Sequence, residues 1–171
     1  MRILWLHEVD YLKKPVFEMH EFPEHLAALR HEVAFVQFPE GSSKIELTNT
    51  PFKQGIEGRV LADTKLTLYT PKTFSGDLLG RLLMVLTFKN QFNNILQDFK
   101  PDVIVSFSVP TSGWQAMAVA KKANVPFVFR ALDVSHKIRR SFFSPLINLA
   151  ERRIYANADW VSANNPAMSE Y

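Results

Sequence analysis

The sequence predicts an α/β fold, in which helices cover both faces of a mostly parallel, Rossmann-like sheet and form a three-layer α/β/α arrangement. Short continuous apolar runs, typical of strands buried on both faces, alternate with longer segments whose apolar residues recur every three or four positions. The chain has 171 residues, of which 47% are hydrophobic, enough for a large core. We therefore expect residues 1–171 to form a single domain.

The predicted strands are apolar runs without helical spacing. RILWL opens the chain, and the fourth run contains the consecutive β-branched residues Val103, Ile104 and Val105. Residues 39–58 hold three of the six Gly and two of the ten Pro, so we expect a loop there. We expect strands at residues 2–6, 32–36, 59–70, 101–107, 126–130 and 159–163.

The predicted helices each carry one apolar face. Residues 75–98 are the clearest case, with Leu and Phe at helical spacing and Ser75 as a cap. Pro23 would kink or restart the first helix, whereas Pro145 suits the first position of a later one. We expect helices at residues 17–30, 75–98, 111–122 and 144–156, and the start of another at 166–171.

Composition excludes several classes of protein. The absence of Cys removes disulfide scaffolds, iron–sulfur clusters and thiol nucleophiles. No apolar run reaches the ~18 residues of a membrane span. Glu8 and Asp10 lie where the cleavage region of a signal peptide would have small, neutral residues. We therefore expect a soluble, cytoplasmic chain.

The formal net charge of +3 is unevenly distributed. Residues 121–153 hold eight Lys/Arg and two Asp/Glu, so this segment alone carries +6. Within it, Lys137, Arg139 and Arg140 lie beside Phe142–Phe143, a combination that can hold a lipid-linked phosphate or contact an anionic membrane at its inner face. A solvated helix and loop, with both Phe side chains in a core, is the alternative. We expect no nucleic-acid partner, because no nucleic-acid module is recognisable.

In open parallel sheets, ligands bind beyond the carboxyl ends of the strands. Here that edge is formed by the loops at residues 7–16, 106–113, 130–142 and 163–166. The first loop contains no Gly, which excludes the dinucleotide fingerprint, and the P-loop and Gly-x-Ser-x-Gly motifs are also missing. The sequence has no Asp-x-Asp and no His-x-x-x-His pair. We therefore predict no metal and no resident cofactor.

Two histidines are candidates for proton transfer. His7 directly follows the first strand, and His20 lies near the start of the first helix. Their structural alternatives are a hydrogen bond to a loop carbonyl for His7 and an ordinary surface position for His20. The loop before the third helix offers Ser108, Thr111 and Gly113, whose hydroxyls and amides can hold a phosphate or sugar oxygen or simply cap the helix. 

Further candidates follow later strands at the same edge. Arg130 and Asp133 come at and after the end of the fifth strand, and Asn164 follows the last one. We include all three among the candidate substrate-binding residues, because side chains that follow parallel strands gather at one edge.

Three segments carry a family resemblance in their order and spacing. They read EMHEFPEHLAALRHEVAFV, PDVIVSFSVPTSGWQAMAVAKKANVPFVFRALD and ERRIYANADWVSANNPAMSEY. Together they resemble the N-terminal domain of a family 4 glycosyltransferase of the GT-B fold. The resemblance covers most of the chain except residues 39–75.

This resemblance implies a two-domain enzyme with a cleft between Rossmann-like halves. The N-terminal half holds a sugar or lipid-linked acceptor, and a C-terminal half binds the nucleotide-sugar donor through a Glu-x7-Glu motif. Transfer in such enzymes retains anomeric configuration and needs no metal. The 171 residues would then be the acceptor half, inactive without the donor half, in a transferase of cell-envelope polysaccharide synthesis.

The sequence departs from the family pattern at several positions. Lys13–Pro15 stands where the family often has Gly-Gly, and Phe107 stands near the family's His, although Ser108 matches. Asp133 is present without its usual basic neighbour. The residues that match the family best are as readily structural as catalytic: Glu151, Ala158, Asp159 and residues 164–166.

Two other functions are consistent with the residues. A free-standing α/β module could bind a phosphorylated ligand or a protein partner without chemistry. A receiver-like signalling domain fits poorly, because it needs clustered acids after the first strand and a Lys after the fifth, where this chain has Arg130 and Asp133.

Overall fold

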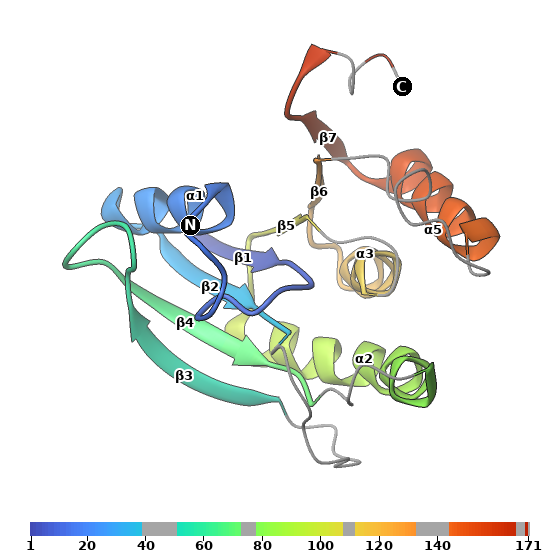
Figure 1. The fold of residues 1–171 in the computed structure, drawn as a ribbon, viewed down its shortest axis with the longest axis horizontal. Coiled ribbons are helices and arrows are strands. Elements are labelled where there is room, and N and C mark those ends of the chain that lie inside the picture. Colours follow the sequence, from blue (N-terminus) through green and yellow to red (C-terminus); the bar gives the residue numbers. More distant parts are fainter. Residues whose placement is uncertain (39–50, 73–77, 108–111, 133–143, 167–169, 171) are drawn as a thin grey trace.

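The fold is built on one seven-stranded sheet, with the strand order β3-β4-β2-β1-β5-β6-β7 (Figure 1). The computed structural model describes residues 1–38, 51–72, 78–107, 112–132, 144–166 and 170, and at 78–84 the backbone alone. Neighbouring strands are parallel, except that β3 runs antiparallel to β4. The strands are β1 (Arg2–Leu6), β2 (Glu32–Val36), β3 (Phe52–Glu57), β4 (Lys65–Thr70), β5 (Val103–Ser106), β6 (Phe127–Ala131) and β7 (Trp160–Ala163).

Helices cover both faces of the sheet, which confirms the predicted three-layer α/β class. Helix α1 packs on β2 and β4, whereas α3 packs against α2 and α5 on the other face (Figure 1). The helices are α1 (Glu18–Ala28), α2 (Leu78–Phe99), α3 (Gly113–Lys122) and α5 (Ser144–Asn157). Each matches a predicted helix, with ends that differ by a few residues.

Side-chain alternation along the central strands divides the core in two. In β1, Leu4 and Leu6 join the cluster under α2, α3 and α5, whereas Ile3 and Trp5 join the cluster under α1. Strand β2 alternates in the same way. Because both faces of these strands are buried, their sequences read as continuous apolar runs, which is why they were predictable.

The prediction for residues 39–70 is wrong in two places. Residues 52–57, expected to be part of a loop, form the edge strand β3. Residues 59–64, expected to begin a strand, form a turn, and β4 starts at Lys65. An edge strand needs no apolar run: FKQGIE is largely exposed, and Lys53 ties it to α2 through an ion pair with Asp98 at 2.6 Å.

Three further sequence predictions concern the helices: a kink at Pro23, a cap at Ser75 and a helix at residues 166–171. Helix α1 continues through Pro23 as one helix. Ser75 and most of the helix expected at 166–171 lie outside the described residues. In the described part of the chain, no helix combines the length and hydropathy that a membrane crossing requires.

Candidate functional site

The order in which the chain adds strands to the sheet reverses between β1 and β5. From β1 the chain crosses through α1 to β2 on one side, and β5 lies on the other side. The crevice beyond the carboxyl ends at such a switch point is where doubly wound sheets bind ligands. In this chain Leu6 and Ser106 end the two strands, and His7 and Phe107 follow them. The candidate site therefore begins at these residues.

An aromatic row lines the switch point and consists of Phe22, Trp5, Phe107, His7 and Phe17. Trp5 stacks on Phe107 with ring centroids 5.3 Å apart, and His7 lies 5.5 Å from Phe107 and 6.2 Å from Phe17. At the other end, Phe22 stacks on Trp5 at 6.3 Å. Phe22 is 41% exposed while Trp5 is buried, so the row runs from the core to the surface.

His7 lies where the sequence predicts, next to the end of β1 and half-buried. Its backbone amide donates to the carbonyl of Val36 at 3.2 Å, which extends the pairing of β1 with β2 by one residue. Its imidazole is positioned by the rings of Phe107 and Phe17. A role in proton transfer stays a prediction.

Glu8 occupies the start of α3. Its Oε1 accepts hydrogen bonds from the backbone amide of Ser112 at 2.8 Å and from the Ser112 hydroxyl at 2.9 Å. A carboxylate at a helix N-terminus is favoured by the helix dipole. The predicted oxygen-binding turn therefore contains an acidic side chain, which would repel a phosphate but not a neutral hydroxyl. Gly113 is buried as the first residue of α3, and Ser108 and Thr111 lie outside the described residues.

Arg130 connects three elements at the carboxyl edge. Its Nη1 donates to the Ser162 hydroxyl and to the Ala163 carbonyl, both at 2.8 Å, which ties β6 to β7. Its Nη2 forms an ion pair with Glu18 Oε2 at 3.2 Å, which ties β6 to the start of α1. The predicted cation at this edge is present, and it is held in place from two sides.

Several polar atoms next to this ion pair have no hydrogen-bond partner among the described residues. They are Arg130 Nε, the second carboxylate oxygen of Glu18 and Trp5 Nε1, and all three are buried. Phe22 joins them, since its ring stacks on Trp5 and lies 5.7 Å from the guanidinium carbon of Arg130. Buried polar groups normally have partners, so these three atoms are the least satisfied polar groups at this edge of the sheet.

Asn164 lies at the same edge, directly after β7, and is exposed. Its amide donates to the Leu132 carbonyl at 3.1 Å and so extends the link between β6 and β7. The candidate Asp133 and the basic residues Lys137, Arg139 and Arg140 lie outside the described residues.

A polar cluster, buried except for its arginine, supports the loop that follows β1. We call Tyr11, His20, Glu24 and Arg59 the Glu24 cluster. The carboxylate of Glu24 accepts from the Tyr11 hydroxyl at 2.8 Å and from three consecutive amides of residues 59–61 at 2.6–2.8 Å. Nη1 of Arg59 donates to the carbonyls of Tyr11 and Lys14. The cluster thus fastens the loop of residues 7–16 to the turn before β4.

His20, a candidate for proton transfer with an ordinary surface position as the alternative, has neither environment, because its side chain is fully buried. Its Nδ1 accepts from the amide of Phe17 at 3.3 Å, so the proton resides on Nε2, which donates to the carbonyl of Tyr11 at 2.8 Å. Nη1 of Arg59 lies 2.9 Å from the same Nε2. In this arrangement His20 positions the loop and does not face a ligand.

Burial and partners set the titration of the cluster. Burial lowers the pKa of His20, and the Arg59 cation lowers it further. Burial alone would raise the pKa of Glu24, but the amides of residues 59–61 outweigh it and lower that pKa. Burial and the neighbouring Glu24 carboxylate raise the pKa of Tyr11. At neutral pH the cluster therefore holds a neutral His20, a neutral Tyr11 and an ionised Glu24.

The acidic residues of the site could not be predicted from the sequence. Glu8, Glu18 and Glu24 lie in polar stretches where a lone carboxylate gives no pattern. Their partners are distant in sequence: 104 residues separate Glu8 from Ser112, and 112 separate Glu18 from Arg130. The only local signal was the position of Glu18 at a helix start, which the dipole favours.

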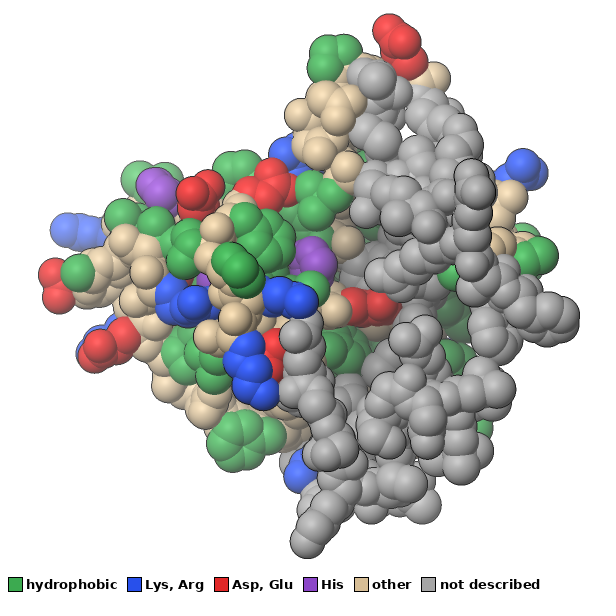
Figure 2. Space-filling model, viewed as in Figure 1, with side chains coloured by type: hydrophobic (Ala, Val, Ile, Leu, Met, Phe, Trp, Pro, Cys, Tyr) green, Lys and Arg blue, Asp and Glu red, His purple; other side chains and the backbone are tan. Residues whose placement is uncertain are grey.

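The distribution of charged side chains and of possible metal ligands indicates which kinds of ligand contact the site offers. Basic and acidic side chains are interspersed over the described part of the face shown in Figure 2, with no single-sign patch there. Lys121 and Lys122 end α3, where the helix dipole favours cations. No group of three His, Asp or Glu side chains suited to a metal occurs among the described residues. The described site is thus suited to hydrogen bonding and aromatic stacking.

Several solved structures share the fold of this chain at low sequence identity. A candidate UDP-N-acetylglucosamine 2-epimerase from Listeria monocytogenes has a TM-score of 0.61 and 10% identity, over 99% of this chain and 40% of the other. The UDP-GlcNAc 2-epimerase of Neisseria meningitidis, bound to UDP-GlcNAc, has a TM-score of 0.56 and 12% identity, over 99% and 42%. Acinetobacter baumannii MurG has a TM-score of 0.52 and 13% identity, over 96% and 41%. The chain thus spans about two fifths of these proteins.

The fold is that of a Rossmann-like domain of the kind that forms the N-terminal half of GT-B proteins. The model of the glycosyl transferase 4-like domain family matches residues 18–171. The chain therefore belongs to this family, as its resemblance implied. No curated protein matches its sequence.

Proposed function

We propose that this domain binds the acceptor of a glycosyltransferase that moves a sugar from a nucleotide-sugar donor to a glycan or lipid-linked acceptor in cell-envelope synthesis. The family match over residues 18–171 supports the transferase class. The observation that carries the acceptor role is the set of unpartnered polar atoms of Glu18, Arg130 and Trp5 beside a partly exposed aromatic ring. Such a surface suits a sugar, which offers hydroxyl groups and an apolar ring face.

In the proposed reaction, the bond between the anomeric carbon and the diphosphate breaks, and the diphosphate leaves with its electron pair. The acceptor oxygen forms the new bond to the anomeric carbon, and its proton passes to the departing diphosphate oxygen. Both atoms are buried, so in this proposal the edge opens on acceptor binding; the second oxygen of Glu18 then accepts a hydrogen bond from an acceptor hydroxyl, and Nε of Arg130 donates one. These contacts would orient the acceptor, and orientation is a major part of the rate enhancement of such reactions.

We further propose that a second, C-terminal domain supplies the donor site, that transfer retains anomeric configuration, and that no metal takes part. The proposed setting is cytoplasmic, with contact to the inner face of an anionic membrane through Lys137, Arg139 and Arg140. Each of these features comes from the family resemblance or from the charge of residues 121–153, and each needs its own test.

The decisive experiment uses the full protein with a panel of UDP- and GDP-sugars, membrane lipid extract and excess EDTA. Nucleotide release and labelled product are measured, and NMR of the product gives its anomeric configuration. We expect transfer with retention that EDTA does not abolish. Loss of transfer in EDTA with recovery on adding Mg²⁺ would contradict metal independence, and an inverted product would contradict retention. Failure of the full protein with every donor would contradict the enzyme function.

A non-catalytic module for a phosphorylated ligand remains the second candidate. The Glu8 carboxylate at the start of α3 is an observation against it, since it places negative charge where the phosphate would bind. Titration of the protein with inorganic phosphate separates the two, because the acceptor function predicts no saturable binding of free phosphate.

A further inference from the structure

Strand β3 forms one edge of the sheet, and no described strand pairs with its outer side (Figure 1). It keeps an unbroken antiparallel register with β4 from Phe52 to Glu57. Natural edge strands are commonly shortened, bulged or interrupted by Pro, because an open row of backbone amides and carbonyls attracts another strand. Strand β3 contains no Pro and no bulge, and its first residue, Phe52, is 56% exposed. It is therefore suited to pair with one more strand.

Two hydrogen bonds show which residues of β3 direct their backbone groups outward. The amide of Gly58 donates to the Thr64 carbonyl at 2.9 Å, so Gly58 pairs inward, with the β4 side. The carbonyl of Tyr69 accepts from the Gln37 amide at 2.9 Å on the β2 side of β4, so Lys53, which lies opposite Tyr69, pairs outward. These directions alternate along an antiparallel strand. Three residues therefore offer their amides and carbonyls to a further strand: Lys53, Gly55 and Glu57.

The side chains of these three residues lie on one face of the sheet, because alternate residues of a strand share a face. This is the α2 face, since Nζ of Lys53 lies 2.6 Å from Asp98 of α2. At the centre, Gly55 is exposed, and a Cβ there would meet nothing within 4 Å. Glu57 is exposed and has no ion pair among the described residues. The outer side of β3 thus has a cation at one end, open space in the middle and an anion at the other end.

Such a strand is complementary to a reversed copy of itself. We propose that β3 pairs with β3 of a second copy of this chain, antiparallel and about a two-fold axis through Gly55. In this register Lys53 lies opposite the partner's Glu57, and symmetry repeats the pair. Each pair of outward residues exchanges two backbone hydrogen bonds. A shift of the partner by two residues would leave an outward residue opposite no strand residue, so the register through Gly55 is favoured.

The proposed dimer has one continuous sheet, in which the strands of the two copies run in opposite directions. Both copies place α2 on the same face of this sheet, because the outward side chains of each copy share the α2 face. The carboxyl ends of β1 and β5 then lie at opposite edges in the two copies. The pairing therefore leaves both candidate sites open, and it does not depend on the function proposed above. 

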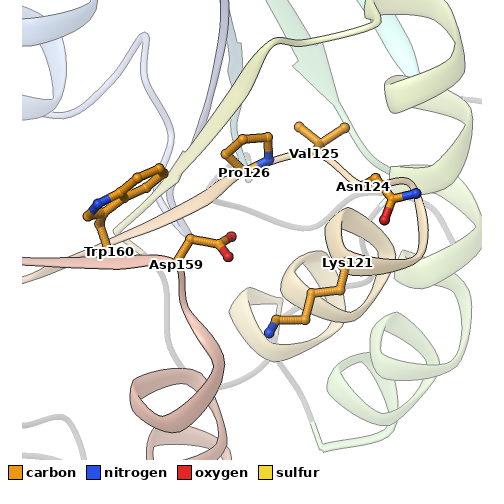
Figure 3. A pocket seen from close by; sticks show the side chains of 6 residues that line it. All are labelled: Lys121, Asn124, Val125, Pro126, Asp159 and Trp160. Carbon is orange, nitrogen blue, oxygen red and sulfur yellow. The ribbon is translucent and has the colours of Figure 1, made fainter.

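The strand at the opposite edge, β7, lacks this complementarity. It comprises Trp160–Ala163, and none of its residues is charged. Figure 3 shows Asp159 and Trp160 where the strand begins. The Asp159 carboxylate accepts from the Phe127 amide at 2.8 Å, so this nearby charge is engaged within its own chain. Pairing of β7 with a second β7 would therefore bring no opposite charges together.

Sedimentation equilibrium of the full protein, without donor or acceptor, measures self-association. A pair of short strands is small beside the ~1,200 Å² of a stable interface, so we expect a weak dimer with a Kd of about 50 µM. Lys53→Glu and Glu57→Lys each place like charges opposite one another and should weaken the dimer at least about tenfold. Lys122→Glu, the same change of charge at an exposed position at the end of α3, is the control and should leave it unchanged.

An equimolar mixture of the two β3 variants gives the sharpest result. In a mixed pair, each position 53 lies opposite a position 57 of the other charge. The mixture should therefore associate about as tightly as the wild type, although neither variant does so alone. The ion pair of Lys53 with Asp98 is half exposed, so its loss should cost little stability. Circular dichroism of each variant checks that it is folded.

Three outcomes would overturn the proposal. The first is a full protein that stays monomeric up to about 500 µM, which is also the result expected if an extended segment of a different protein occupies this edge. The second is a dimer that both charge reversals leave unchanged, which would assign self-association to another surface. The third is a mixture that associates no better than either variant alone. Because no transfer is measured, each of these results leaves the proposed transferase function untouched.

Discussion

The hydroxyl of Tyr11 donates to the carboxylate of Glu24 at 2.8 Å, and thereby connects the loop after β1 with the interior of α1. The same carboxylate accepts from three consecutive amides of residues 59–61. Four donors around one buried carboxylate make Glu24 the centre of the support beneath the candidate site. Its removal is therefore a sensitive test of whether that support stabilises the domain.

We expect Glu24→Gln to lower the free energy of unfolding by about 2–4 kcal/mol, because the Gln amide presents donors to donors and leaves buried amides unpaired. Urea unfolding followed by circular dichroism measures the change. Glu21→Gln, at an exposed position of the same helix, is the matched control and should change stability by less than about 0.5 kcal/mol. Equal effects of the two substitutions would show that the cluster contributes no specific stability.

Gly58 precedes these amides, and its close surroundings predict a second effect. A Cβ at this position would lie 2.0 Å from the Thr64 hydroxyl oxygen, 2.6 Å from the Leu61 carbonyl oxygen and 2.7 Å from the Glu24 carboxylate. We expect Gly58→Ala to cost about 2–3 kcal/mol of unfolding free energy, as overpacked sites do. Gly55→Ala, whose Cβ would meet nothing within 4 Å, is the control. The urea midpoints of the two variants, each compared with that of the wild type, measure the difference in stability. A Gly58→Ala protein as stable as the wild type would contradict the close packing around Gly58.

His20 predicts how stability depends on pH. Above its ordinary pKa of 6.5 the residue is neutral in the folded and the unfolded chain, so it contributes no pH dependence. Below pH 6.5 the unfolded chain binds a proton first, because burial has lowered the pKa of His20 in the folded state. Stability should therefore fall as the pH drops from 6.5 toward that lower value and level off beneath it.

The unfolding free energy measured from pH 7.5 to pH 4.5 checks this expectation. In His20→Gln the part of the slope that begins near pH 6.5 should disappear, although the variant will be less stable overall. His25→Gln, at an exposed position, should keep the slope. A His20→Gln profile parallel to the wild type would assign the pH dependence to other groups.

Topology explains which parts of the fold and the site the sequence could predict. The central strands are buried on both faces, so their apolar runs identified them, and the parallel order then placed His7, Arg130 and Asn164 at one edge. Strand β3 was missed because it is an exposed edge strand and carries its polar residues outward.

Pairings across long sequence separations could not be predicted. Whether a carboxylate is solvated or buried depends on what the fold brings against it, and no local pattern records that. Glu24 accepts hydrogen bonds from the amides of residues 59–61, which the sequence predicts to begin a strand, and Nε2 of His20 lies 2.9 Å from Arg59 in the same turn. Ion pairs of this kind, and turns whose amides bind a carboxylate, form only in the folded state. They can therefore be identified from the structure but not from the sequence.

The ion pair between Glu18 and Arg130 gives the last prediction. The two side chains are only 25% and 16% exposed, and they join α1 to β6 at the candidate site. A double-mutant cycle with Glu18→Gln and Arg130→Gln should give a coupling of about 1 kcal/mol in the free energy of unfolding. The pair of Arg2 and Glu32, which is 35% and 59% exposed, is the matched control and should couple more weakly.

Acceptor kinetics of the full protein separate a positioning role from a purely structural one. Glu18→Gln keeps the size of the side chain but removes the charge that accepts hydrogen bonds most strongly. If Glu18 orients the acceptor, this variant should raise the acceptor KM or lower kcat by about tenfold or more while the donor KM stays constant. Unchanged acceptor kinetics in a variant that has lost stability would restrict the ion pair to holding α1 against β6.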